Sequence, residues 1–324
     1  MNEIIRKTIE KCTGCDVCKL PCPVWRQTRD PALTFSGRAK ALQGGASPED
    51  LHKSLMACIL CGSCGPACPE NIDTLETTLY LRAYLMGLGF APFPAQPLSP
   101  GSSHGRIDYA LKNYDRRTFL PCEPILENTT ILNRIEKLLG NEIPVSIGDG
   151  PWTAISSGIR AGFCRSQGLK AQIRQAFRET DELIVSDGLL LQKLRGWLPD
   201  VRVMGLGEAL IRLPGIHGAL RSSDFYIIES TAFHSDYSRL ISLYDHVRAE
   251  TGCRMNLDLQ RIAIPTGSSC PQDRYDSNQV DPLEQARWII NESEFKRIVV
   301  ESMYDLDVFR KITGSPVIHV SELV

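Results

Sequence analysis

Two cysteine runs, Cys12–Pro23 (CTGCDVCKLPCP) and Cys58–Pro69 (CILCGSCGPACP), decide how this chain is organised. Both follow the spacing C-x2-C-x2-C-x3-C-P, which is the ligand run of bacterial [4Fe–4S] clusters. Thiolates placed three residues apart can wrap a cubane within one tight loop, and the proline fixes the direction of the fourth cysteine. Because the run occurs twice, the sequence predicts two [4Fe–4S] clusters.

The same spacing predicts which thiolates share a cluster, because in two-cluster ferredoxins the fourth cysteine of each run binds the other cluster. The expected ligands are Cys12, Cys15, Cys18 and Cys68 for cluster 1, and Cys58, Cys61, Cys64 and Cys22 for cluster 2. Gly14, Gly62 and Gly65 would bring backbone N–H groups near the sulfurs and so tune the reduction potentials. Two alternatives fit the cysteines less well. Disulfides are typical of small secreted chains, and structural zinc would leave the Cys-Pro of each run unexplained.

Composition is that of an ordinary globular protein. The chain has 324 residues, 43% hydrophobic and 23% charged, which is enough for two or three domains. A net charge of −2 gives no pull towards nucleic acid. No apolar run approaches the roughly 20 residues of a membrane-spanning helix. Twelve cysteines without a secretory segment favour a reducing, cytoplasmic location, with any membrane association made through a partner.

The spacer between the two runs is too long for a compact ferredoxin, and its pattern is helical. Ser47 and Asp73 are expected to cap helices, with Pro48 at the first helical position of one of them. The expected helices cover residues 37–42, 48–57 and 74–86. These features are typical of an α-helical ferredoxin domain, which we place at residues 1–90.

Strands and helices alternate after a linker rich in Pro and Gly at residues 91–117. We expect strands at 118–120, 145–147, 182–186, 201–204, 225–229, 261–264, 297–301 and 317–320. Helices are expected at 107–114, 131–139, 169–177, 189–197, 238–250, 282–292 and 304–312. Val201–Leu210 echoes Val317–Leu323, which indicates an internal repeat with halves at 118–220 and 221–324. The predicted fold class is α/β: an N-terminal α-helical ferredoxin domain followed by a pseudo-duplicated α/β domain with parallel sheets.

The N-terminal part resembles a known family. Phe35-Ser36-Gly37-Arg38 and the second cysteine run are similar to the iron–sulfur subunits of glycolate oxidase, D-lactate dehydrogenase and anaerobic glycerol-3-phosphate dehydrogenase. They are also similar to the small cluster subunit of heterodisulfide reductase. The resemblance implies a complex in which the partner is a flavoprotein dehydrogenase or a heterodisulfide-reductase-like subunit.

The repeated half resembles the paired cysteine-rich (CCG-type) domain of the same family, but its ligand motifs are degenerate. The segments Gly148–Gly150, Asp187–Leu190, Thr266–Cys270 and Ser302–Asp305 stand where that family carries them. Only Cys122 and Cys270 remain at such positions, and Cys164 and Cys253 lie elsewhere. Since a cluster needs about four thiolates, we expect these four cysteines to be buried apolar residues.

The resulting prediction is a non-catalytic electron-transfer subunit that relays electrons through two [4Fe–4S] clusters between a catalytic partner and another redox carrier. An alternative remains open, in which the C-terminal domain is itself a thiol/disulfide or small-molecule reductase site fed by the clusters. That alternative predicts a reactive, low-pKa Cys122 or Cys270. A third possibility is a redox sensor with solvent-exposed clusters.

Overall fold

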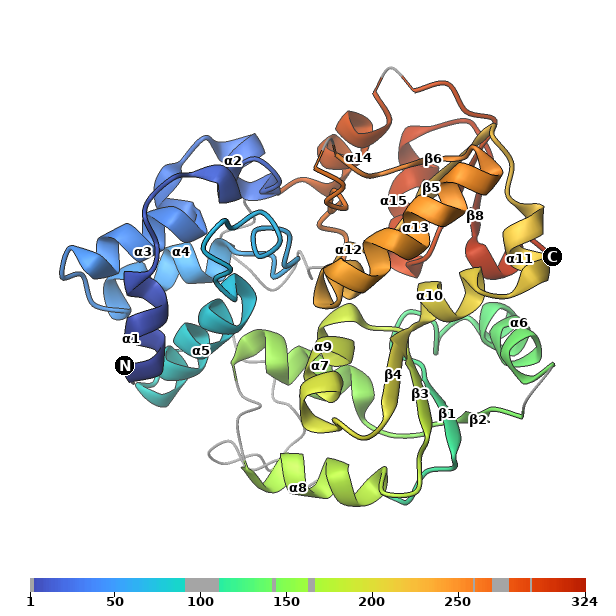
Figure 1. Ribbon diagram of the computed structural model, residues 1–324, viewed down its shortest axis with the longest axis horizontal. Helices are drawn as coiled ribbons and strands as arrows, with labels where there is room; N and C mark the ends of the chain where they lie inside the picture. Colours follow the sequence, from blue (N-terminus) through green and yellow to red (C-terminus); the bar gives the residue numbers. More distant parts are fainter. Residues whose placement is uncertain are drawn as a thin grey trace.

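Three bodies lie side by side in the computed structural model, which describes residues 3–90, 111–141, 144–162, 167–258, 260–269, 280–291 and 293–324 (Figure 1). A helical N-terminal body occupies one end of the long axis. Two α/β bodies, each with its own sheet, occupy the other end. The chain termini therefore lie at opposite ends of the molecule.

The N-terminal body is built from helices, and the sequence predicts those from residue 35 onwards but not the two before it. They are α1 Glu3–Glu10, α2 Pro23–Thr28, α3 Phe35–Gln43, α4 His52–Ala57 and α5 Thr74–Gly87, with the 3-10 turns η1 Val17–Lys19, η2 Pro31–Leu33 and η3 Glu49–Leu51. Ser47 and Asp50 bond reciprocally: the Asp50 N–H donates to Ser47 Oγ over 3.3 Å, and the Ser47 N–H donates to the carboxylate over 2.8 Å. The Asp73 carboxylate accepts the Glu76 N–H over 2.8 Å at the start of α5. The predicted Asp73 cap is thus confirmed. The helix predicted from residue 48 begins instead as the 3-10 turn η3, and α4 starts only at His52 without a side-chain cap.

Two parallel four-stranded sheets follow, and they have the same strand order. The strands are β1 Arg117–Leu120, β2 Ser146–Ile147, β3 Glu182–Val185, β4 Arg202–Gly205, β5 Asp224–Ile227, β6 Arg254–Met255, β7 Arg297–Val300 and β8 Val317–His319. The orders are β2-β1-β3-β4 and β6-β5-β7-β8. The predicted α/β class with an internal repeat is confirmed, and β4 and β8, which carry the sequence echo, occupy equivalent positions.

Helices connect and cover these strands. They are α6 Thr129–Gly140, α7 Trp152–Ala161, α8 Gln167–Ala176, α9 Gly188–Trp197, α10 Leu206–Ile211, α11 Pro214–Ala219, α12 Ser230–Ser235, α13 Tyr237–Thr251, α14 Pro282–Ile290 and α15 Met303–Ile312, with the turn η5 Val320–Glu322. The sequence patterns indicated α6, α8, α9, α13, α14 and α15. They missed α7, which contains several Ser and Gly residues, and the six-residue helices α10, α11 and α12. Tertiary packing outweighs such weak helix propensity.

One expected strand is wrong. The second strand of the second sheet is β6, whereas residues 261–264 contribute one isolated antiparallel bridge, between Leu257 and Ala263. Arg261 has φ 62°, a left-handed conformation that interrupts an extended strand. Ile262 and Ala263 are nevertheless buried, so their apolar pattern reflects burial and not a ladder. Of the helix expected at 107–114, residues 107–110 lie outside the described residues and 111–114 are irregular.

The hydrophobic core continues from one body to the next. Alternate residues of the first sheet face opposite ways: Phe119, Ile184 and Met204 pack in one cluster with the second sheet. The residues next to these on each strand point to the other face of the sheet and pack with α7, α8 and α9 in a second cluster. That second cluster also contains Leu60 and Leu75 of the N-terminal body. Apolar contacts therefore cross the predicted domain boundaries.

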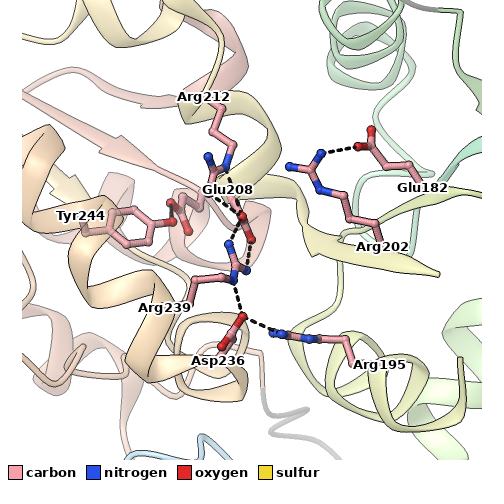
Figure 2. A network of polar contacts seen from close by, with 9 residues as sticks. Glu182, Arg195, Arg202, Glu208, Arg212, Asp236, Arg239 and Tyr244 are labelled. Carbon is pink, nitrogen blue, oxygen red and sulfur yellow. Dashed lines mark hydrogen bonds and ion pairs between the residues drawn. The ribbon is translucent and has the colours of Figure 1, made fainter. Parts of the chain in front are cut away.

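A buried polar network also joins the two repeats (Figure 2). The Glu208 carboxylate on α10 is 4% exposed and accepts bonds from Arg239 on α13 and, over 3.1 Å, from Arg212. Asp236 pairs with Arg239 and, over 2.5 Å, with Arg195 on α9. Asp236 and Arg195 belong to different repeats, so the network fixes α9 against the start of α13.

Glu301, at the end of β7, is a buried carboxyl group between the repeats. It accepts bonds from the hydroxyls of Tyr226 (2.8 Å) and Tyr244 (2.5 Å) and from the Glu229 N–H (2.8 Å). Gly207 packs directly on it, since a Cβ at that position would overlap the Glu301 carboxyl group. Burial raises the pKa of Glu301 from 4.5 to about 7, and it raises the pKa of Glu229 to about 7 as well.

These carboxyl groups predict a pH-dependent stability. Between pH 4.5 and about 7 the folded state binds more protons than the unfolded state. The free energy of unfolding should therefore fall as pH rises through this window, by up to about 3 kcal/mol for one group. Glu301→Gln keeps an acceptor for the tyrosines but does not ionise, so its melting temperature should depend less on pH than the wild-type value.

Thermal unfolding followed by circular dichroism between pH 5 and pH 8 measures this effect. Glu136→Gln, at an exposed position on α6, is the matched control and should follow the wild-type pH profile. A Glu301→Gln profile parallel to the wild-type profile would contradict the role given to this group.

Candidate metal centre

The two cysteine loops share one backbone pattern. In the first loop Gly14 (φ 78°) and Asp16 (φ 64°) flank Cys15, and in the second loop Leu60 (φ 58°) and Gly62 (φ 75°) flank the corresponding cysteine. A left-handed residue on each side of the middle cysteine turns the chain tightly around one point. Leucine rarely adopts positive φ, so its presence here indicates a backbone held for function. The glycines were visible in the sequence, whereas Asp16 and Leu60 gave no such signal.

The predicted ligands of cluster 2 line one pocket. Cys22 precedes α2, with Pro23 as the first residue of that helix, and Cys58 follows α4. Cys61 and Cys64 come from the loop after α4. The lining is Cys18, Cys22, Pro23, Val24, Leu33, Phe35, Arg38, Cys58, Ile59, Leu60, Cys61, Gly62, Ser63, Cys64, Thr74, Leu75 and Thr78. Thiols from both runs thus meet in mainly apolar surroundings, and Cys18 of the other predicted set lies beside them.

The predicted ligands of cluster 1 lie next to this pocket. Cys12, Cys18 and Cys68 belong to one hydrophobic cluster together with Ile5 and Ile9 of α1. The neighbouring Ile4 is 73% exposed, so only one face of α1 covers the cysteines. The fourth predicted ligand, Cys15, is exposed.

The chemistry of the pocket fits thiolate ligands. Burial raises the pKa of Cys22 to about 11 and that of Cys61 to about 12, and it raises the pKa of Cys64 well above its usual value. These side chains are therefore neutral thiols until a cation compensates the thiolate charge, as metal binding does. Hydroxyl groups also reach the sulfurs: Ser63 lies 3.2 Å from Cys61 Sγ and Thr74 lies 2.9 Å from Cys64 Sγ. Such groups would donate hydrogen bonds to bound thiolates and so tune a cluster.

A single metal ion has no site among the described residues, where no three Cys, His, Asp or Glu side chains could hold one. A cubane makes a different demand, because each thiolate binds a separate iron atom of the cluster. The separation of the thiols around the pocket is therefore compatible with a cluster.

Arg82 connects the second cysteine loop to the first repeat. This guanidinium on α5 is 0% exposed and donates to the carbonyl groups of Leu55 (2.8 Å), Met56 (3.3 Å) and Cys58 (2.5 Å). It also donates to the Arg160 carbonyl on α7 over 2.8 Å. The cation thus holds the end of α4, where Cys58 begins the loop.

His234 connects the same loop to the second repeat. Its Nδ1–H on α12 donates to the Cys61 carbonyl over 2.8 Å, and the ring packs against Gly62. Burial lowers the pKa of His234 to about 4, so the ring is neutral. No local pattern in the sequence indicates a role for Arg82 or His234, because their partners are distant in the chain.

Arg38 is a third buried cation near the ligands. It is 3% exposed, lines the pocket, and donates to the carbonyl groups of Leu33 (3.0 Å) and Ser54 (3.1 Å). The sequence pattern Phe35-Ser36-Gly37-Arg38 includes this arginine but does not indicate what its side chain does.

A second pocket lies between the repeats, at the carboxyl ends of four strands. Cys122 follows β1, Asp187 follows β3, Glu229 follows β5 and Glu301 follows β7. Arg160 donates to Asp187 over 3.1 Å, and the Arg160 charge and bonds hold the pKa of Asp187 below its usual value despite burial. Two of the segments compared with ligand motifs in the sequence, Asp187–Leu190 and Ser302–Asp305, contribute carboxyl and hydroxyl groups here, whereas Gly148–Gly150 does not line this pocket.

The remaining segment of that kind lies close by. Hydroxyls of Thr266 and Ser268 donate to the Asp305 carboxylate over 2.5 and 2.7 Å. A third pocket contains these residues together with Cys61 and Glu229. It shares Cys61 with the cysteine pocket and Glu229 with the pocket between the repeats, so the three hollows adjoin.

The cysteines outside the two runs do not form a thiol centre among the described residues. Cys122 and Cys253 are 3% and 1% exposed. Burial raises the pKa of the Cys122 thiol well above its usual value, as it raises the pKa of Cys253. The low-pKa Cys122 expected for thiol chemistry is thus contradicted. Cys164 and Cys270 lie outside the described residues.

Comparison with known proteins agrees with this geometry. Residues 8–72 match the model of the 4Fe-4S dicluster domain, so this part of the chain is similar to iron–sulfur domains of that kind. Over 196 residues, 48% of the chain, the protein is 24% identical to one component of the dihydromethanophenazine:CoB–CoM heterodisulfide reductase of Methanosarcina acetivorans. The aligned part covers 47% of that relative, about half its length. No solved structure matches the chain.

Among the described residues, none of the helices has the length and apolar character needed to cross a bilayer.

Arg82 provides a test of how the cysteine loop is held. Arg82→Ala leaves several buried carbonyl groups unpaired, so we expect it to lower the free energy of unfolding by about 3–5 kcal/mol. The anaerobically purified variant should also contain less iron. Arg116→Ala removes an ion pair that is mostly exposed and should cost at most about 1 kcal/mol. Thermal melts and iron assays of both variants check this, and equal effects would contradict the role of Arg82.

Proposed function

We propose that this chain is an electron-transfer subunit that relays electrons through two [4Fe–4S] clusters between a catalytic partner and another redox carrier. The observation that carries the proposal is the convergence of buried thiols from both cysteine runs on one pocket. When bound, the clusters supply one-electron redox chemistry. The chain's own residues hold the loops, exclude water and place hydroxyl groups near the sulfurs.

The proposed ligands are those that the spacing predicts. Cys12, Cys15, Cys18 and Cys68 would hold cluster 1, and Cys22, Cys58, Cys61 and Cys64 would hold cluster 2. The lining of the cysteine pocket supports the second set, and the packing of Cys12, Cys18 and Cys68 supports the first. Cys18 lies in both regions, so the two clusters would be neighbours and electrons could pass between them.

The two α/β bodies would serve to dock the subunit in a complex. By resemblance, the catalytic partner is a flavoprotein dehydrogenase or a heterodisulfide-reductase-like subunit. The relative from Methanosarcina acetivorans, which is named as part of a heterodisulfide reductase, supports the heterodisulfide-reductase-like partner. The proposed domains are residues 1–90 for the clusters and 118–220 and 221–324 for the two repeats, joined by a linker at 91–117.

Paired ligand variants test this assignment. If the fourth cysteine of each run serves the other cluster, Cys22→Ser and Cys58→Ser should perturb the same electron paramagnetic resonance signal. Cys12→Ser and Cys68→Ser should perturb the other signal. The anaerobic wild-type protein should contain about eight iron atoms per chain. Cys253→Ser, at a buried position outside the runs, is the control and should keep both signals. A shared signal for Cys12→Ser and Cys22→Ser would contradict the pairing.

A second candidate function rests on the adjoining hollows. We propose that the pocket between the repeats receives a small polar molecule that accepts electrons from cluster 2. The third pocket, which shares Cys61 with one hollow and Glu229 with the other, supports this route. The polar lining, with Arg160, Asp187 and Tyr304, favours a polar ligand.

The burial of Cys122 separates this candidate from thiol chemistry. A buried thiol with a raised pKa should react slowly with iodoacetamide. We therefore expect Cys122 to remain unmodified in the native protein at pH 8 and to react once the chain is unfolded in guanidinium, as mass spectrometry would show. Cys122→Ser should keep the electron-transfer rate to an artificial dye. Rapid native labelling with loss of that rate would revive a reductase that uses this thiol.

A further inference from the structure

One end of the first cysteine loop faces solvent. Cys15 is exposed, whereas the other seven predicted ligands are buried or half-buried. Leu20, later in the same loop, is a large apolar side chain that is 68% exposed. A loop that exposes both a predicted ligand and a large apolar residue is the place where the protein would shield a cluster least from a partner.

Basic side chains surround this end of the loop. Lys40 on α3 donates to the Cys12 carbonyl over 3.2 Å and packs against Gly14. Lys19 pairs with Asp16 over 2.8 Å, and its ammonium lies 5.0 Å from the centre of the Trp25 ring.

Two further cations extend this surface at the two ends of the loop. The Arg29 guanidinium lies 5.8 Å from the centre of the Trp25 ring, which Lys19 also contacts. Lys11 is exposed and directly precedes Cys12. We call the face formed by Lys11, Cys15, Lys19, Leu20, Arg29 and Lys40 the loop face.

The charge of the N-terminal body is uneven. Residues 1–43 contain eight Lys or Arg and four Asp or Glu, whereas residues 44–90 contain two and five. Arg38 and Arg82 are buried and donate to backbone carbonyl groups. They therefore add no positive charge to the surface. The exposed positive charge thus concentrates on the side of the first run, although the whole chain carries −2.

We propose that the loop face is the docking surface on which an acidic redox protein exchanges electrons with cluster 1. This inference rests on the proposed electron-transfer function. An exposed apolar centre with a charged rim is the anatomy of small transient interfaces, to which many redox encounters belong. One electron passes from the reduced centre of the carrier to cluster 1, so the carrier is oxidised and the cluster reduced. No covalent bond forms or breaks.

A matched pair of charge reversals tests the proposal on the anaerobic holo-protein. Lys11→Glu changes the loop face, and Lys53→Glu makes the same charge change at an exposed position of α4 in the same body. The probe is flavodoxin hydroquinone, an acidic one-electron donor, mixed with the oxidised protein in a stopped-flow instrument. At low ionic strength Lys11→Glu should lower the second-order rate constant about tenfold, and Lys53→Glu should change it less than twofold.

Salt and a basic carrier provide two further measurements. The difference between the variants should shrink at 1 M salt, where the Debye length is about 3 Å. Ferricytochrome c, a basic acceptor, should oxidise reduced Lys11→Glu faster than it oxidises reduced wild-type protein. Arg29→Glu, at the other end of the loop, should behave like Lys11→Glu with both carriers.

The outcomes separate this proposal from the proposed function. Equal effects of Lys11→Glu and Lys53→Glu overturn the docking surface, because only overall charge would then matter. A shift in the midpoint potential of cluster 1 that accounts for the rate change also overturns it, because the cations would then serve the anionic cluster. Two clusters seen by electron paramagnetic resonance after dithionite reduction uphold the electron-transfer function in either case, and their absence from the wild-type protein overturns both.

Discussion

The buried guanidinium of Arg82 is the interaction on which the arrangement of this protein depends. One side chain without solvent exposure satisfies carbonyl groups at the end of α4, including that of Cys58, and the Arg160 carbonyl on α7. A buried cation with unpaired carbonyl groups around it is costly, so the two elements stay together. The position of a predicted cluster ligand is thereby tied to the body that carries the pocket between the repeats.

Arg160 extends this connection. Its carbonyl accepts from Arg82, and its guanidinium pairs with Asp187 in the pocket between the repeats. His234 makes a parallel connection from the second repeat to the Cys61 carbonyl. The second repeat therefore contacts the second cysteine loop directly, and the first repeat is joined to it through Arg82. The packing of the two repeats thus supports the geometry of this loop.

The two sheets repeat one architecture around a shared polar pocket. Their strand orders are identical, and residues at the carboxyl ends of β1, β3, β5 and β7 line one pocket. The groups that follow these strands are Cys122, Asp187, Glu229 and Glu301. Burial raises the pKa of Glu229 and Glu301 to about 7 although hydrogen bonds oppose this shift, so both groups are partly protonated at pH 7. The pocket is thus a polar site whose charge depends on pH.

Much of the fold could be predicted from local pattern. Periodic apolar residues identified the long helices, the capping residue Asp73 located the start of α5, and the echo between Val201–Leu210 and Val317–Leu323 identified the repeat. The prediction was wrong at residues 261–264, because a short buried apolar run without a ladder looks like a strand. It also missed α7, α10, α11 and α12, since short segments with weak helix propensity become helical only through packing.

The sequence by itself determined the cysteine spacing, and with it the kind of cofactor and the domain that would hold it, because thiolates within one short loop are a local feature. Only the tertiary structure decided the rest. It placed thiols from both runs around one pocket, and it brought Arg82 and His234 to the second loop from positions 24 and 173 residues away from their cysteine partners. It also left Cys15 at the surface among basic side chains. Contacts between residues so distant in the chain depend on packing, which no local pattern records.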